Sequence, residues 1–184
     1  DPTKTLPLNF FSLGDAATHV QKVSRANFFA DMLRRISGIG QVQRQNVYES
    51  IMEAYGTCAE GHWPLIHDVF DIYRQKTGGR ADSVVSVLSL VTDLRVFEDN
   101  PDNVVSFNEL FTGNTVLKLS ELGGAGQEIV DIVATMFLDH LYQDYMKRST
   151  KAPFLKAEDG TSRRQVDTFI LIDEAHHAMG RGFD

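Results

Sequence analysis

The stretch that decides the expected fold is TFILIDEAHH, which runs from Thr168 to His177. Four bulky apolar residues in it lead directly into two carboxylates, Asp173 and Glu174. A short, continuous apolar run of this kind is typical of a strand that is buried on both faces. The sequence therefore predicts a buried strand over 169–172 that presents two acids at its tip.

Two acids at the tip of a buried strand suit the hydrolysis of a nucleotide, because one can serve a metal ion and the other a water molecule. Asp173 would hold Mg²⁺ through a water molecule. Glu174 would orient and deprotonate the attacking water. The pair resembles the Walker B element of P-loop ATPases, so ATP and Mg²⁺ are the cofactors expected for the full-length protein.

The phosphate-binding loop of such ATPases reads G-x-x-x-x-G-K-[ST], and it occurs nowhere in the 184 residues. The glycine-rich run 123–126 precedes an expected helix, but it has no lysine or hydroxyl, and Glu121 and Glu128 flank it. Because acids there would repel phosphate, we interpret the run as a tight turn with close helix–strand packing. The sequence thus predicts part of an ATPase, which is expected to be inactive in isolation.

Apolar periodicity predicts a mostly helical first half of the chain. Helices are expected over about 16–36, over about 41–55, from Pro64 to just before Gly78, and over about 83–97, where the valine-rich sequence also permits a strand.

The second half is expected to contain a strand–helix–strand crossover with parallel strands. Its elements are a strand over 116–119, a long helix over 127–147, a polar loop over 148–165 and the final strand. We therefore expect a helical insertion over about 14–100 and a strand–helix–strand core over about 101–184 that ends in the two acids.

Composition and charge exclude several classes of protein. The net charge of −7 argues against a surface coated with basic residues for nucleic acid, so any contact with DNA must be local. No apolar run approaches the roughly 18 residues of a membrane span. The single cysteine, Cys58, cannot form an internal disulfide, which fits a cytoplasmic location.

Two further clusters have less specific interpretations. The basic residues of 147–151, with Lys156, Arg163 and Arg164, suit either a loop that touches phosphates or a neighbouring subunit, or a solvated loop, which we favour. A metal site that uses the acids together with His176 and His177 is disfavoured, because adjacent histidines cannot easily face one ion and no H-E-x-x-H spacing exists.

Three segments resemble the HerA/FtsK superfamily of P-loop motor ATPases, in particular its HerA and type IV secretion branch. Residues 1–10 resemble the segment after that family's second core strand. Residues 114–122 and the helix after them resemble its next strand and helix, and 169–177 resemble its Walker B motif in the Asp-Glu-Ala-His form.

The resemblance implies an α/β fold, a partial RecA-like P-loop NTPase core with parallel strands and a large helical insertion. It also implies the Walker B roles for Asp173 and Glu174, and a phosphate loop that lies before Asp1. The function implied is that of an ATP-hydrolysing DNA translocase or helicase-like motor, in a DNA restriction or defence system. DNA, further copies of the chain in a ring, and other subunits of a defence or translocation complex are the partners expected.

Two alternatives remain open. Asp173 to His176 also spells the box of DEAH-type helicases, although those enzymes keep their phosphate loop upstream within a comparable span, where this chain has none. A Ser-Ala-Thr motif shortly after Asp184 would favour this alternative. The missing phosphate loop motivates the other alternative, a non-catalytic scaffold module with a degenerate ATPase fold.

Overall fold

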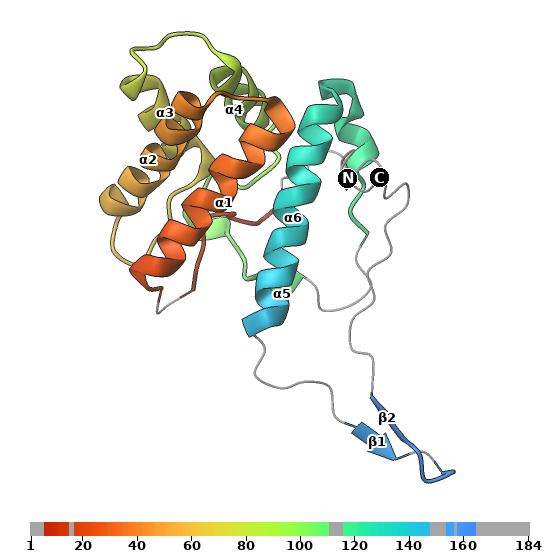
Figure 1. Ribbon diagram of the computed structural model, residues 1–184. Helices are drawn as coiled ribbons and strands as arrows, with labels where there is room; N and C mark the ends of the chain where they lie inside the picture. The colour runs from red at the N-terminus through yellow and green to blue at the C-terminus, as the bar shows by residue number, and fades with distance from the viewer. Residues whose placement is uncertain (1–5, 15–16, 111–115, 148–153, 157, 165–184) are drawn as a thin grey trace.

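The computed structural model of the chain describes residues 6–14, 17–110, 116–147, 154–156 and 158–164. The helices among them, in chain order, are α1 (His19–Ser37), α2 (Gln41–Thr57), α3 (Ile66–Lys76), α4 (Ser83–Asp93), the 3₁₀ helix η1 (Pro101–Asn103), the short α5 (Phe107–Leu110), the 3₁₀ helix η2 (Leu119–Ala125) and α6 (Gln127–Lys147). Two short strands, β1 (Phe154–Lys156) and β2 (Ser162–Arg164), follow α6 (Figure 1).

The expected α/β fold, a partial RecA-like core with parallel strands, is wrong for these residues, which are predominantly helical. Within the described ranges, β1 and β2 form an antiparallel hairpin, and parallel pairing is limited to one isolated bridge between Leu6 and Phe97. No parallel sheet joins the helices there. The strand expected over 169–172 lies outside the described residues.

The strand expected over 116–119 is also wrong. Residues 116–118 have no regular structure, Val116 is 79% exposed, and η2 begins at Leu119. Leu119, Leu122 and Ala125 pack against the hydrophobic core, and their spacing of three residues matches the three-residue turn of a 3₁₀ helix. Packing on a neighbouring helix therefore outweighs the strand propensity of the preceding valine.

The helices expected in the first half are confirmed, with α4 shorter than predicted. The chain leaves α4 through Arg95, whose φ of 48° lies in the left-handed region. It then pairs with the N-terminal segment, because the Leu6 N–H donates to the Val96 carbonyl over 2.8 Å and the Glu98 N–H donates to the Leu6 carbonyl over 3.0 Å. The polar loop expected over 148–165 is partly wrong, since it contains the β1–β2 hairpin.

Polar side chains define where the helices begin. Thr18 and Gln21 form a reciprocal capping box at the start of α1, and Gly38, with φ of 63°, ends that helix. Asp82 caps α4, since its Oδ1 accepts from the Val85 N–H over 2.9 Å.

A single cluster of buried apolar residues joins the helices to the segment before α1. Figure 1 shows α1–α4 gathered together, with α6 standing beside α1. The largest fully buried side chains of the cluster come from that first segment and from all five long helices: Phe11, Phe29, Met32, Leu33, Val47, Ile51, Val69, Tyr73, Leu88, Ile129, Ile132 and Met136. No helix in the described part is long and apolar enough to cross a bilayer.

One charged side chain is buried between α1 and α6. Arg25 of α1 is 6% exposed and forms an ion pair with Asp139 of α6, which is 11% exposed. The Arg25 guanidinium carbon also lies 4.6 Å from the centre of the Phe10 ring. The pair thus connects the N-terminal segment, α1 and α6.

Replacing Asp82 tests the local structure of the α3–α4 corner. Besides capping α4, its carboxylate accepts a hydrogen bond from the buried Tyr73 hydroxyl over 2.7 Å. Asp82→Ala should lower the free energy of unfolding by about 1–2 kcal/mol, because it removes the cap and leaves that hydroxyl without its partner. Urea denaturation measures the loss. Asp93→Ala, at the exposed far end of the same helix, is the matched control and should cost less than about 0.5 kcal/mol.

The difference in unfolding free energy between the wild type and Asp82→Ala should decrease at low pH. Burial alone would raise the pKa of Asp82, but hydrogen bonds from Val85, Tyr73 and Gln43 outweigh it, so the pKa is lowered. The stabilising effect is therefore complete above the unfolded-state pKa of about 3.9 and is lost as pH falls below it. A difference between the wild type and Asp82→Ala that stays constant from pH 7 to pH 3 would contradict this.

Candidate functional site

The two acids predicted from the sequence to serve a nucleotide, Asp173 and Glu174, lie outside the described residues. The same holds for His176 and His177, which the alternative metal site would use.

The glycine-rich run 123–126 is not a phosphate loop in the structure. Its first three residues end η2, and Gly126, with φ of 102°, turns the chain into α6. The tight turn expected over 123–126 is therefore wrong for 123–125, which are helical, and the break before α6 is at Gly126. The expected close packing is wrong at Gly124 and Gly126, since an added Cβ would meet no atom within 4 Å at either position.

The basic residues of the predicted polar loop fall partly on the hairpin. Lys156 belongs to β1, and Arg163 and Arg164 belong to β2, where the backbone register pairs Leu155 with Arg163 and Phe154 with Arg164. Residues 148–153 lie outside the described ranges. The choice between a contact surface and a solvated loop stays a prediction.

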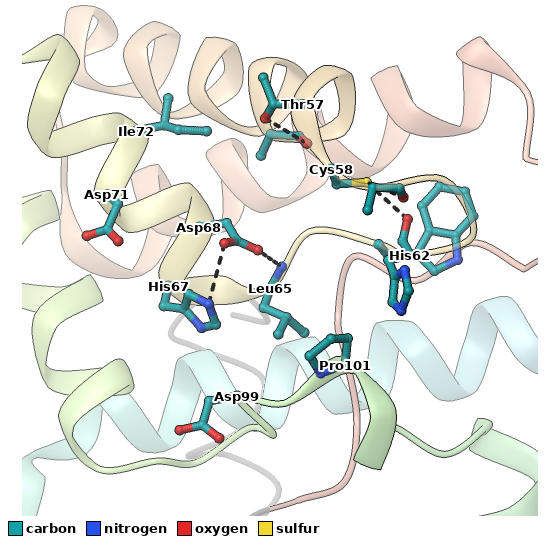
Figure 2. A pocket seen from close by; sticks show the side chains of 13 residues that line it. Thr57, Cys58, His62, Leu65, His67, Asp68, Asp71, Ile72, Asp99 and Pro101 are labelled. Atoms are coloured by element: carbon teal, nitrogen blue, oxygen red, sulfur yellow. Dashed lines mark hydrogen bonds and ion pairs between the residues drawn. The ribbon is translucent and has the colours of Figure 1, made fainter.

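Among the described residues, a cleft of about 510 Å³ is the candidate binding site. The sequence did not predict it. It lies between the end of α2, the loop that follows, α3 and the segment around η1 (Figure 2). Its polar lining consists of Thr57, Cys58, His62, His67, Asp68, Asp71 and Asp99. Apolar side chains line the rest: Ala54, Ala59, Trp63, Leu65, Ile72 and Pro101.

Asp68 is fixed in the cleft by the start of α3. Its Oδ2 accepts from the Leu65 N–H over 2.7 Å, which caps the helix, and its Oδ1 lies 3.4 Å from Nε2 of His67. Figure 2 shows Asp71 and Asp99 toward the side of the cleft away from Cys58 and His62. The carboxylates thus gather toward one side.

Cys58 marks the other side of the cleft. Its thiol donates to the His62 carbonyl over 3.0 Å, and the His62 Nε2 lies 3.9 Å from Oδ1 of Asp102. Burial raises the pKa of the Cys58 thiol, and the positive charge of Lys22 opposes this rise. Cys58 is therefore predominantly a neutral thiol near pH 7, which does not suit a nucleophile.

Trp63 forms an apolar wall of the cleft. Its ring meets that of Tyr55 edge to face, with 6.0 Å between the ring centres, and the ammonium of Lys22 lies 5.8 Å from its centre. No sequence motif indicates this cleft. Most of its lining falls between Ala54 and Ile72, and the fold adds Asp99 and Pro101 from a later segment.

The lining of the cleft combines carboxylates with the two histidines His62 and His67. It contains three carboxylates and no lysine or arginine. Among the residues that the structure describes, no group of three His, Cys, Asp or Glu side chains is arranged to hold a metal ion. The site therefore offers dispersed negative charge over an apolar surface rather than a metal centre.

Comparisons with known proteins identify no family for the chain. No family model matches the chain, and no curated protein matches its sequence. The resemblance to HerA/FtsK motors consequently stays an expectation from the three sequence segments.

The structure predicts slow reaction of Cys58 with thiol reagents. Its raised pKa lowers the thiolate fraction, so iodoacetamide should alkylate the folded protein more slowly than the urea-unfolded chain at pH 8. Lys22→Met should slow the reaction further, because it removes the charge that opposes the rise in pKa. Mass spectrometry of timed samples measures both rates. Faster alkylation of the folded protein than of the unfolded chain would contradict the assignment.

Proposed function

We propose that the chain is a helical module of an ATP-hydrolysing motor that moves DNA, within a restriction or defence system. The observation that carries this proposal is the sequence of 168–177, in which four bulky apolar residues lead directly into Asp173 and Glu174. In the full-length protein Asp173 holds the magnesium ion of ATP through water, and Glu174 orients and deprotonates the attacking water. A phosphate loop supplied by another segment or subunit completes the site.

The helical body supports a role as an attached module. Its core runs from Leu8 in the first segment to Met136 in α6, so the described helices bury their apolar faces against one another. A body with its own core can hold its shape while a nucleotide site is assembled elsewhere.

The charge distribution limits how such a module meets DNA. With a net charge of −7, a broad contact with phosphates is unfavourable. The basic residues of 147–151, with Lys156, Arg163 and Arg164, are the part of the chain that would make a local contact if the loop is not simply solvated. DNA as a partner and the assembly of copies into a ring follow from the resemblance to HerA/FtsK motors.

A second candidate is a binding module without catalysis. The acidic cleft between α2 and α3 favours it, because the cleft has the mixed apolar and charged lining of a recognition site. The two functions do not exclude one another, since a motor also needs surfaces that hold its partners.

Glu174→Gln in the full-length protein tests the proposed role of the acid pair. ATP turnover should fall by about 10²-fold or more, because the attacking water loses its base, while ATP binding is retained. Glu128→Gln, an exposed position on α6, is the matched control and should leave turnover unchanged. Phosphate release and nucleotide titration measure the two quantities.

The chain by itself should neither hydrolyse ATP nor bind Mg-ATP at micromolar concentration, because it contains no phosphate loop. Undiminished turnover by the full-length Glu174→Gln protein would refute the role of Glu174. Micromolar binding of Mg-ATP by the isolated chain, measured by calorimetry, would refute the claim that the phosphate loop comes from elsewhere.

A further inference from the structure

The last two turns of α6 carry large apolar side chains that the helical body does not bury. Tyr142, Tyr145 and Met146 are each more than half exposed. Their spacing of three and four residues places them on one face of the helix. Earlier in α6, by contrast, Ile132 and Met136 are buried in the core. The end of α6 therefore presents a face that is largely aromatic and open to solvent.

Basic charge is concentrated directly after this face. Residues 147–164 contain six basic residues and two acids, which gives them a net charge of +4. Because the whole chain carries −7, its other residues together carry −11. The register of the hairpin pairs Lys156 with Ser162 and Phe154 with Arg164, so both strands contribute basic residues to one two-stranded ribbon.

The hairpin lacks the support that a small sheet needs. Figure 1 shows it beyond the last turn of α6 and away from α1–α4. Within the described residues, β1 and β2 form a sheet only with each other. A two-stranded hairpin without a core is marginally stable in water, so a partner that binds this ribbon also stabilises it. The hairpin is thus a second observation, besides the exposed rings, that points to a binding partner.

A single-stranded nucleic acid matches the chemistry of both parts. Each nucleotide brings one phosphate, which suits lysine and arginine, and one flat base, which stacks on an aromatic ring. A duplex offers the same phosphates but keeps its bases stacked inside, so exposed tyrosines gain little from it. A helix that lies on a membrane needs a broad apolar face for the lipid, and the core already takes most of the apolar face of α6.

We propose that the end of α6 and the β1–β2 hairpin form one binding surface for single-stranded nucleic acid. Bases stack on Tyr142 and Tyr145, and the phosphates meet the basic residues of the hairpin. The inference rests on the proposed function only in taking DNA as the nucleic acid. It uses neither the acid pair nor ATP, so binding can fail while hydrolysis by the full-length protein stands, and the reverse.

The test measures the binding of a fluorescein-labelled oligothymidylate of about 20 nucleotides to the chain by fluorescence anisotropy, without ATP. The single strand should bind at least about tenfold more tightly than a duplex of the same length at the same salt concentration. Its affinity should fall as salt is raised, because binding of phosphates releases counterions.

Variants of the two tyrosines test the stacking. Tyr142→Ala with Tyr145→Ala should weaken binding by about tenfold or more, because the bases lose the rings on which they stack. Tyr142→Phe with Tyr145→Phe keeps both rings and should stay within about twofold of the wild type. Val20→Ala with Val42→Ala, at exposed apolar positions of α1 and α2, is the matched control and should also stay within about twofold. Circular dichroism and urea denaturation verify that the variants fold.

Variants of equal charge separate the hairpin from other basic surface. The hairpin variant replaces three basic residues by glutamine: Lys156→Gln, Arg163→Gln and Arg164→Gln. The control variant makes the same change at three exposed arginines of the helical body: Arg34→Gln, Arg35→Gln and Arg80→Gln. The hairpin variant should bind about tenfold more weakly at low salt, and its logarithmic salt dependence should be shallower by about 2, since each phosphate contact on a single strand contributes about 0.7. The control variant should keep the salt dependence of the wild type.

Equal losses in the hairpin and control variants would overturn the proposal, since they would show attraction to positive charge anywhere on the chain. Unchanged affinity of the double alanine variant, equal binding of the duplex, or no binding up to roughly 100 μM at low salt would also overturn it. A dimer that the double alanine variant disrupts and the oligonucleotide does not would assign the face of α6 to a second copy. Displacement of the oligonucleotide by phosphatidylserine vesicles would assign it to anionic lipid, and either result would refute the proposal.

Discussion

The helical body depends on one buried charge. Removing a guanidinium from water is costly unless a carboxylate compensates it. Among the described residues, Arg25 finds this carboxylate in Asp139, which lies 114 residues away in the chain. The pair fixes which face of α6 meets α1, and Phe10 stacks against the same guanidinium. The N-terminal segment, the four-helix group and α6 therefore share one geometric constraint, around which their apolar side chains pack.

Local patterns were sufficient to predict the long helices but not the architecture. The apolar spacing of α1 and α6, and the breaks at Gly38 and Gly78, are properties of short windows of sequence. The wrong prediction of a strand over 116–119 shows the limit of such windows. Val116 favours a strand, but Leu119, Leu122 and Ala125 pack against the hydrophobic core from the 3₁₀ helix η2, which lies beside α6. The parallel core came from a resemblance, and nothing in the described residues supports it.

One candidate site can be found from the sequence, and the other only from the structure. Asp173 and Glu174 are adjacent in sequence, so a motif reveals them without a structure. The cleft combines side chains from α2, α3 and the segment around residue 99, and each of these is unremarkable when it is considered alone. Asp99 reaches the cleft only because the segment between α4 and η1 returns to α3 in the folded chain. The proposed roles are therefore catalysis for Asp173 and Glu174 and partner binding for the cleft.

The claim that the helices form one body joined through Arg25 and Asp139 is tested most directly by a double-mutant cycle with Arg25→Met and Asp139→Asn, measured by urea denaturation. The account predicts a loss of about 3–5 kcal/mol for Asp139→Asn, which leaves Arg25 buried without its partner, and a coupling energy of about 2 kcal/mol or more. Additive effects within about 0.5 kcal/mol would show that the two side chains do not interact, and would contradict the docking of α6 on α1 described above.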